Sequence, residues 1–243
     1  MSSASPSDTE SASQLDLART LSFFFEDPNW IHKLLVGSLF AFLAPALVGT
    51  VFIVGYSVHL ARQTMKRSTG APGGLPEWDD LQGIFVDGLK GVAISLAHKI
   101  PLFLFGMLML FALFGGVLLE RQGGGDFSET LLGYGLPLLF SGWVLIFLLS
   151  LLILGYVPAA FVRFIQTDRL AAAFDVADNI EFIRDNSANY VIALLGILLA
   201  VIIGQLGIVL FCVGVFPTTF WSVCTMGYVC GELARLDVSP PKN

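Results

Sequence analysis

Long apolar runs alternate with short polar stretches along this chain, and this pattern is typical of a membrane protein. A helix that spans a bilayer needs roughly 20 predominantly apolar residues. Five runs approach or exceed that length, at residues 34–60, 100–119, 131–156, 191–215 and 217–234. We therefore predict an all-α, polytopic transmembrane helical bundle with about five membrane segments.

The first run, residues 34–60, permits two interpretations because Pro45 lies near its middle. Proline removes a backbone hydrogen bond and kinks or breaks a helix. The run is either one tilted, kinked span or a hairpin of two half-length helices that enters and leaves on one side of the membrane. We prefer the single span. The hairpin remains the alternative, and the side of the membrane on which the N-terminus lies depends on this choice.

The N-terminal residues divide into two parts. Residues 1–14 are rich in Ser, Ala, Asp and Glu, and this composition predicts a disordered tail. Residues 15–30 predict a short interfacial segment with Trp30 at the membrane edge, and a strand in loose contact with lipid is the alternative. The transmembrane helical domain is then expected in residues 31–236, and residues 237–243 are expected to form a C-terminal tail.

The most polar stretch between two apolar runs is residues 73–90, which begins Gly-Gly-Leu-Pro-Glu-Trp-Asp-Asp. Pro76 suits the first position of a helix, where a missing N–H costs nothing. The dipole of a helix favours carboxylates in its first turn, and the acids here are Glu77, Asp79 and Asp80. The sequence therefore predicts a helix that begins at Pro76.

Apolar residues recur three and four positions apart after this start, which places them on one helix face. They are Leu81, Ile84, Phe85, Leu89, Val92 and Leu96. We expect this helix to lie on the cytoplasmic membrane interface and to bend into the bilayer near Pro101. Trp78 is then expected at the level of the lipid headgroups, where an indole ring is half hydrated.

A second interfacial amphipathic helix is predicted between residues 167 and 189. Asp168 is expected to cap its start by accepting hydrogen bonds from free backbone N–H groups. Its apolar face carries Leu170, Phe174, Ala177, Ile180 and Ile183.

Basic residues follow alternate apolar runs, and they predict the orientation of the chain. They are Arg62, Lys66, Arg67, Arg163, Arg169 and Arg235. Because cytoplasmic loops are enriched in Lys and Arg, we expect a multi-pass membrane protein with a cytoplasmic C-terminus. Gly123 and Val215 are then expected near the outer face.

A Gly-Tyr pair followed by an arginine occurs three times, in Gly55-Tyr56 with Arg62, Gly155-Tyr156 with Arg163, and Gly227-Tyr228 with Arg235. Glycine permits close helix packing, tyrosine suits the interface, and arginine reaches lipid phosphates. We interpret the pattern as a possible internal duplication of span, interfacial helix and span. Chance recurrence in an aromatic-rich membrane protein is the alternative. Gly231, four residues after Gly227, extends the predicted packing face.

Composition agrees with a membrane location. Hydrophobic residues make up 55 % of the chain, charged residues 13 %, and the mean hydropathy is +0.78. An ordinary soluble domain has about 25 % charged residues. The net charge of −6 and the scattered basic residues argue against nucleic acid as a partner. The expected partners are the lipid bilayer and a membrane or cytoplasmic protein.

Several motifs together resemble a known family. They are Leu21-Ser22-Phe23, Glu26-Asp27-Pro28-Asn29-Trp30, Gly55-Tyr56, Leu75-Pro76-Glu77-Trp78-Asp79-Asp80 and Asp87-Gly88-Leu89-Lys90. The chain is similar, over roughly residues 20–235, to a prokaryotic polytopic membrane family that is defined only as a domain of unknown function. The resemblance implies a plasma-membrane protein and carries no activity, substrate or cofactor. The residues before position 15 depart from the family pattern.

Residues with catalytic or metal-binding chemistry are scarce. Glu77, Asp79, Asp80 and Asp87 offer the oxygen ligands of a divalent cation, but their spacing fits no known loop. No phosphate-binding or hydrolase motif is present. Cysteines occur only in apolar runs, at Cys212, Cys224 and Cys230, where we expect small core residues. We therefore predict neither an enzyme nor a metal or cofactor.

The sequence suggests two possible functions. The preferred one is a non-enzymatic membrane scaffold or interaction protein whose candidate surface comprises Pro76, Glu77, Trp78, Asp79, Asp80 and Asp87. The alternative is a transporter or channel subunit with a pathway near Gln205 and the last span. Gln205 is the one strongly polar residue near the centre of a run, and we expect it to bond a neighbouring helix.

Overall fold

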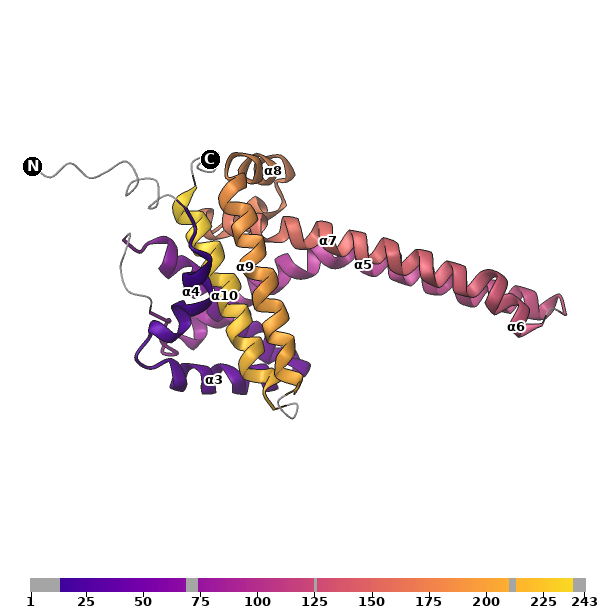
Figure 1. Ribbon diagram of the computed structural model, residues 1–243, viewed down its shortest axis with the longest axis horizontal. Coiled ribbons are helices and arrows are strands. Elements are labelled where there is room, and N and C mark those ends of the chain that lie inside the picture. Colours follow the sequence, from indigo (N-terminus) through magenta and orange to yellow (C-terminus); the bar gives the residue numbers. More distant parts are fainter. Residues whose placement is uncertain (1–13, 69–73, 125, 210–212, 238–243) are drawn as a thin grey trace, which may run out of the picture. The chain divides into compact units, whose positions relative to one another are not determined.

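The structure is a computed structural model that describes residues 14–68, 74–124, 126–209 and 213–237 (Figure 1). Within these residues the regular structure is helical throughout, which confirms the all-α prediction. The tails predicted at residues 1–14 and 237–243 lie almost entirely outside the described residues, as does Cys212.

The chain forms two compact units. The first unit comprises Met1–Ile94 and Pro158–Asn243, and the second comprises Ser95–Val157. Helix α5 (Leu81–Gln122) and helix α7 (Leu136–Thr167) each contribute one part to both units.

The second unit is a hairpin made by the end of α5 and the start of α7. A short helix, α6 (Phe127–Thr130), and a π-helical turn (Leu131–Gly135) connect the two. The Tyr134 hydroxyl on this turn donates a hydrogen bond to the Ala112 carbonyl of α5 at 2.9 Å. Such a hairpin leaves most of its apolar surface exposed, as expected for helices surrounded by lipid.

Three of the described helical stretches are long and apolar enough to cross a membrane, namely Leu81–Leu119, Ser128–Thr167 and Ser187–Val209. They contain most of the runs predicted at residues 100–119, 131–156 and 191–215. The helix predicted to continue past Pro101 is α5, which runs through this proline as one helix of 42 residues.

The run at residues 34–60 is a hairpin, and the preferred single span is wrong. Helix α3 (Trp30–Phe42) ends before a 3-10 turn (Ala44–Ala46) that contains Pro45, and α4 (Val48–Met65) follows. The chain reverses with Leu47 at a positive φ of 64°. Phe40 of α3 then stacks on Phe52 of α4, with ring centroids 4.5 Å apart.

Helix α4 lies at the centre of the first unit and packs closely against α5. Glycines make this approach possible: a Cβ at Gly55 would collide with the Ile84 carbonyl, and one at Gly88 would collide with the Val51 carbonyl. The backbones therefore touch where the two helices cross, and a side chain at either glycine would separate them.

The last helix, α10 (Val215–Leu236), packs on another side of α4 in the same manner. A Cβ at Gly227 would meet the Ser57 carbonyl, and one at Gly231 would meet the Ala61 carbonyl. Helix α9 (Ser187–Leu206) runs antiparallel to α10, since Asn186 bonds Asp237 at one end and Thr218 bonds the Gly204 carbonyl at the other.

The predicted interfacial segment at residues 15–30 packs on the protein. It forms α2 (Leu17–Ser22) and a 3-10 turn (Phe23–Glu26). Phe23 stacks on Tyr228 of α10 with centroids 4.1 Å apart, and Phe24 is fully buried. The apolar face that suggested a lipid-bound helix therefore contacts α9 and α10.

The helix predicted between residues 167 and 189 is present as a 3-10 turn (Leu170–Phe174) followed by α8 (Val176–Asp185). Its start is capped by Asp175, which accepts from the Asp178 N–H, so the cap predicted at Asp168 is wrong. The predicted apolar face is exposed, with Leu170 at 40 %, Phe174 at 46 % and Ile180 at 54 %.

Replacement of Gly227 by leucine should lower the thermal stability of the detergent-solubilised protein. The new side chain would strike the backbone of α4, and overpacking of this kind costs about 1–3 kcal/mol. Gly106→Leu is the matched control, because no atom lies within 4 Å of its Cβ position. Equal melting temperatures of the two variants would contradict the packing of α10 on α4.

Candidate functional site

The Leu-Pro-Glu-Trp-Asp-Asp sequence at residues 75–80, hereafter the LPEWDD segment, is not helical. Helix α5 begins at Leu81, and the Asp80 carboxylate caps it by accepting from the Gly83 N–H at 2.8 Å. The helix start predicted at Pro76 is therefore wrong. Tertiary contacts hold the backbone of residues 74–80 in an irregular conformation, although Pro76 and the acids favour a helix locally.

A buried lysine holds this segment in place. The Lys33 side chain is 2 % exposed, and its Nζ lies 2.9 Å from Asp27 Oδ2 and 2.6 Å from Glu77 Oε1. Lys33 Nζ also donates to the Leu75 carbonyl at 2.8 Å. The Leu75 N–H in turn donates to Asp27 Oδ2 at 2.7 Å. Both backbone groups of Leu75 are thus bonded to one buried ion pair.

The Asp27 carboxylate is held in its charged form. Burial by itself would raise its pKa, but the Leu75 N–H and the Lys33 ammonium outweigh that effect and leave the pKa below its ordinary value. Charge-assisted hydrogen bonds of this kind are shorter and stronger than neutral ones. The Lys33–Asp27 pair therefore holds the turn that precedes α3 against the LPEWDD segment.

Aromatic contacts hold the next part of the segment. The Tyr56 hydroxyl donates to the Pro76 carbonyl at 2.7 Å. The Trp78 indole stacks on the Tyr56 ring at 4.3 Å and on the Phe40 ring at 5.1 Å. Trp78 is therefore partly buried against the aromatic core, whereas the sequence suggested a position among lipid headgroups.

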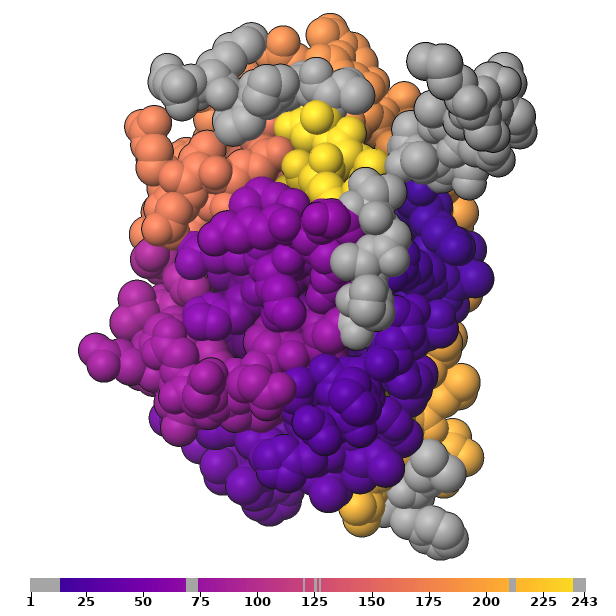
Figure 2. All heavy atoms as spheres, turned by 90° about the vertical axis from the view of Figure 1, so that its left-hand side faces the viewer, coloured from indigo at the N-terminus to yellow at the C-terminus, as the bar shows by residue number. Residues whose placement is uncertain are grey.

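The acidic side chains of the segment remain accessible. Asp79 and Asp80 are exposed, and the Glu77 side chain is 62 % exposed although it pairs with Lys33. Figure 2 shows the N-terminal helices and the start of α5 side by side on one face. The arrangement is a fixed backbone that displays carboxylates.

A second polar cluster surrounds Asp87 on α5. Asp87 Oδ2 lies 2.8 Å from Arg62 Nη1 and 3.0 Å from His59 Nε2. Arg62 Nη2 and Lys90 Nζ also pair with Asp168 Oδ1, at 2.6 Å and 3.2 Å. Asp87, predicted as part of an interaction surface, is 5 % exposed and instead joins α4 to α5.

A third cluster surrounds Arg163 of α7, whose side chain is 1 % exposed. Its Nε lies 2.9 Å from Asp178 Oδ2 of α8, and its Nη1 lies 2.8 Å from Asp237 Oδ2. The guanidinium also lies over the Phe182 ring, 4.9 Å from the centroid. Asn186 donates to Asp237 Oδ1 at 2.8 Å, so the end of α10 is bound to α7, α8 and α9.

The arginines after the Gly-Tyr pairs form ion pairs within the protein. Arg62 and Arg163 each pair with an acid on the next helix, Asp87 and Asp178 respectively, and Arg235 pairs with Glu232. The sequence could not show the partners of Arg62 and Arg163, since these lie 25 and 15 residues away, whereas the i,i+3 spacing of Glu232 and Arg235 is visible in it.

The Gly-Tyr pairs themselves differ. Gly55 and Gly227 permit close helix contacts, but no atom lies within 4 Å of a Cβ placed on Gly155. Tyr156 contacts the His98 ring at 5.3 Å, while Tyr56 and Tyr228 belong to the aromatic core.

Residues considered for other chemistry have structural environments. Gln205 is exposed on α9, and the Thr225 hydroxyl donates to the Trp221 carbonyl of its own helix. Cys224 and Cys230 are buried and free. Among the described residues, no group of three or more His, Cys, Asp and Glu side chains is arranged to hold a metal ion.

Replacement of Lys33 by methionine should destabilise the protein by about 3–5 kcal/mol, because it leaves the Asp27 carboxylate buried without its cation. Glu77→Gln should cost at most about 1 kcal/mol, because that partner is largely exposed. Thermal unfolding in detergent measures both changes. Similar losses of stability in the two variants would show that burial of the Lys33–Asp27 pair does not determine its contribution to stability.

The Arg163 cluster gives a parallel prediction. Arg163→Met should cost about 3–5 kcal/mol, because Asp178 and Asp237 would lose a buried cation. The control, Arg184→Met, removes an arginine that is 77 % exposed and should change stability by no more than about 1 kcal/mol. An Arg163→Met protein as stable as the wild type would contradict the stabilising role of the Arg163 cluster.

Comparison with known proteins agrees with the resemblance seen in the motifs. No curated protein and no solved structure matches the chain. A family model matches residues 38–213, a narrower range than the residues 20–235 over which the motifs suggested similarity. The match includes the LPEWDD segment and the Asp87 cluster up to Asp168, and it ends before α10. The chain belongs to this family, which is described as a protein of unknown function (DUF4013).

Proposed function

We propose that this protein is a non-enzymatic membrane scaffold that presents the LPEWDD segment to a protein partner with a basic surface. One observation carries the proposal. The backbone of the segment is fixed by the buried Lys33–Asp27 pair and by Tyr56, while Asp79 and Asp80 are exposed.

A fixed segment of this kind is suited to recognition. A flexible loop loses conformational entropy when it binds, and rigid positioning before binding removes that cost. Exposed carboxylates on such a segment attract and orient a basic partner surface. Asp79 and Asp80 are not required for the buried contacts, and asparagine replaces aspartate well as a helix cap. Their charge is therefore available for binding.

The proposed setting is the plasma membrane of a prokaryotic cell, with a cytoplasmic C-terminus. Because α3 and α4 form a hairpin, both of its ends return to one side, and the N-terminus is then cytoplasmic as well. Arg62 and Arg163 lie near the C-terminal ends of α4 and α7, in keeping with the enrichment of basic residues on that side. The hairpin, α10 and the three apolar helical stretches give the five membrane segments of this proposal.

The exposed apolar face of α8 supports an interfacial position for that helix. Phe174 at the end of the 3-10 turn and Val176 and Ile180 on α8 are 46 %, 58 % and 54 % exposed, and Arg184, one turn after Ile180, has a side chain that is 77 % exposed. Apolar side chains beside a basic one fit the boundary between acyl chains and anionic headgroups.

An internal duplication is part of the proposal. Arg62 of α4 pairs with Asp87 at 2.8 Å, and Arg163 of α7 pairs with Asp178 at 2.9 Å. In both cases a Gly-Tyr helix ends in an arginine that binds an acid on the next helix. The similar partners favour a repeated unit over chance recurrence.

The transport alternative gains no support from the residues that suggested it. Gln205 faces away from the packed helices, and the Thr218 hydroxyl is bonded to the Gly204 carbonyl at 2.8 Å. A pathway needs polar groups that face a shared interior. We therefore retain the scaffold proposal.

The test is affinity capture from native membranes solubilised in mild detergent. The double variant Asp79→Asn and Asp80→Asn should keep the wild-type melting temperature, since the caps persist, and should lower recovery of the partner at least tenfold. The expected partner has a basic surface and dissociates as salt concentration rises.

The control is Glu181→Gln with Asp185→Asn, which removes the same amount of charge from α8. It should recover the partner as well as the wild type does. Equal recovery from the LPEWDD variant and the wild type would overturn the proposed interaction surface.

A further inference from the structure

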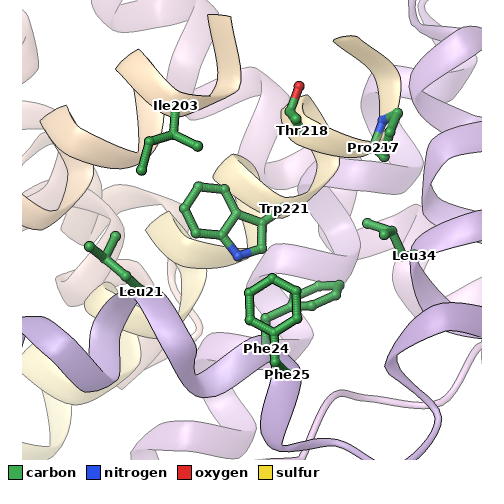
Figure 3. A pocket seen from close by; sticks show the side chains of 8 residues that line it. All are labelled: Leu21, Phe24, Phe25, Leu34, Ile203, Pro217, Thr218 and Trp221. Carbon is green, nitrogen blue, oxygen red and sulfur yellow. The ribbon is translucent and has the colours of Figure 1, made fainter. Parts of the chain in front are cut away.

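An apolar hollow lies where the N-terminal segment meets α3, α9 and α10 (Figure 3). It has a volume of about 350 Å³. The lining residues are Leu21, Phe24, Phe25, Leu34, Ile203, Pro217, Thr218 and Trp221. All of them belong to the first unit.

The lining offers almost no polar atoms to a ligand. The Thr218 hydroxyl already donates within the protein, with the Gly204 and Gly214 carbonyls each at 2.8 Å. The remaining lining side chains are aliphatic or aromatic, with the Trp221 indole among them (Figure 3). A ligand with polar groups in this position would lose its hydrogen bonds to water without replacement. The apolar lining therefore favours a hydrocarbon ligand.

The hollow adjoins exposed apolar surface of a helix that is long and apolar enough to cross a membrane. Its lining residues Phe25 and Ile203 are 53 % and 37 % exposed. Ile203 belongs to the apolar stretch Ser187–Val209, whose neighbouring Ile202 and Leu206 are 49 % and 59 % exposed. A hydrocarbon chain in the surrounding bilayer can therefore enter from the side without crossing a polar region.

Size distinguishes an acyl chain from a protein segment. A helix with its side chains is about 10 Å across, whereas 350 Å³ equals the volume of about a dozen water molecules at about 30 Å³ each. The hollow therefore accepts a flexible chain of methylene groups.

We propose that this hollow binds one acyl chain of a membrane phospholipid. The chain lies against Phe24 and Trp221 and fills the space between the N-terminal segment and the spans. It thereby joins α2 and the following 3-10 turn to α9 and α10 through hydrocarbon contact. The proposal is independent of the partner surface on the LPEWDD segment.

Native mass spectrometry of protein reconstituted in phosphatidylcholine vesicles and then extracted in mild detergent tests this site. The wild-type protein should retain one phosphatidylcholine per chain. Ile203→Trp, which fills the hollow, should lower the retained fraction at least tenfold. Ile202→Trp is the matched control on the neighbouring lipid-facing position and should retain lipid as the wild type does.

Leu34→Trp fills the hollow from α3 and provides a second variant if Ile203→Trp does not fold. Circular dichroism spectra like that of the wild type establish that a filled variant is folded. Retention of one phosphatidylcholine by a folded filled variant would overturn the proposal, as would a wild-type protein that retains none.

Discussion

The buried ion pair between Lys33 and Asp27 is the constraint on which the arrangement of the first unit depends. An ammonium group that is 2 % exposed must be compensated, since an unpaired buried charge costs several kcal/mol. The compensation comes from the Asp27 carboxylate, the Leu75 carbonyl and Glu77. Asp27, which precedes α3, and the LPEWDD segment are thereby bound to each other across 48 residues of sequence.

The same principle applies to the other polar clusters. Arg62 and Arg163 are compensated by acids on neighbouring helices, and each cluster joins elements that are distant in sequence. Between these clusters the helices pack through glycines, as at Gly55 and Gly227, where backbones make contact without side chains. Helix packing in membranes relies on such close approach and on polar contacts, because lipid provides little hydrophobic driving force between helices.

The sequence predicted the features that local pattern determines. The helical class and three of the five predicted membrane-length stretches follow from composition and periodicity. It failed where distant contacts prevail over local preference. Pro76 favours a helix start, but the Tyr56 hydroxyl and the contacts of Leu75 hold an irregular backbone there. The choice between a kinked span and a hairpin at Pro45 rests on packing between Phe40 and Phe52, which spacing alone does not reveal.

A buried charge fixes the backbone of the LPEWDD segment, and amide hydrogen exchange resolved at Leu75 tests this constraint most directly. The Leu75 N–H lies outside any helix but donates to the buried Asp27 carboxylate at 2.7 Å. Its exchange should therefore be as slow as that of core amides in α4, and Lys33→Met should accelerate it. Exchange of Leu75 in the wild-type protein at the rate of an unstructured peptide would contradict the account.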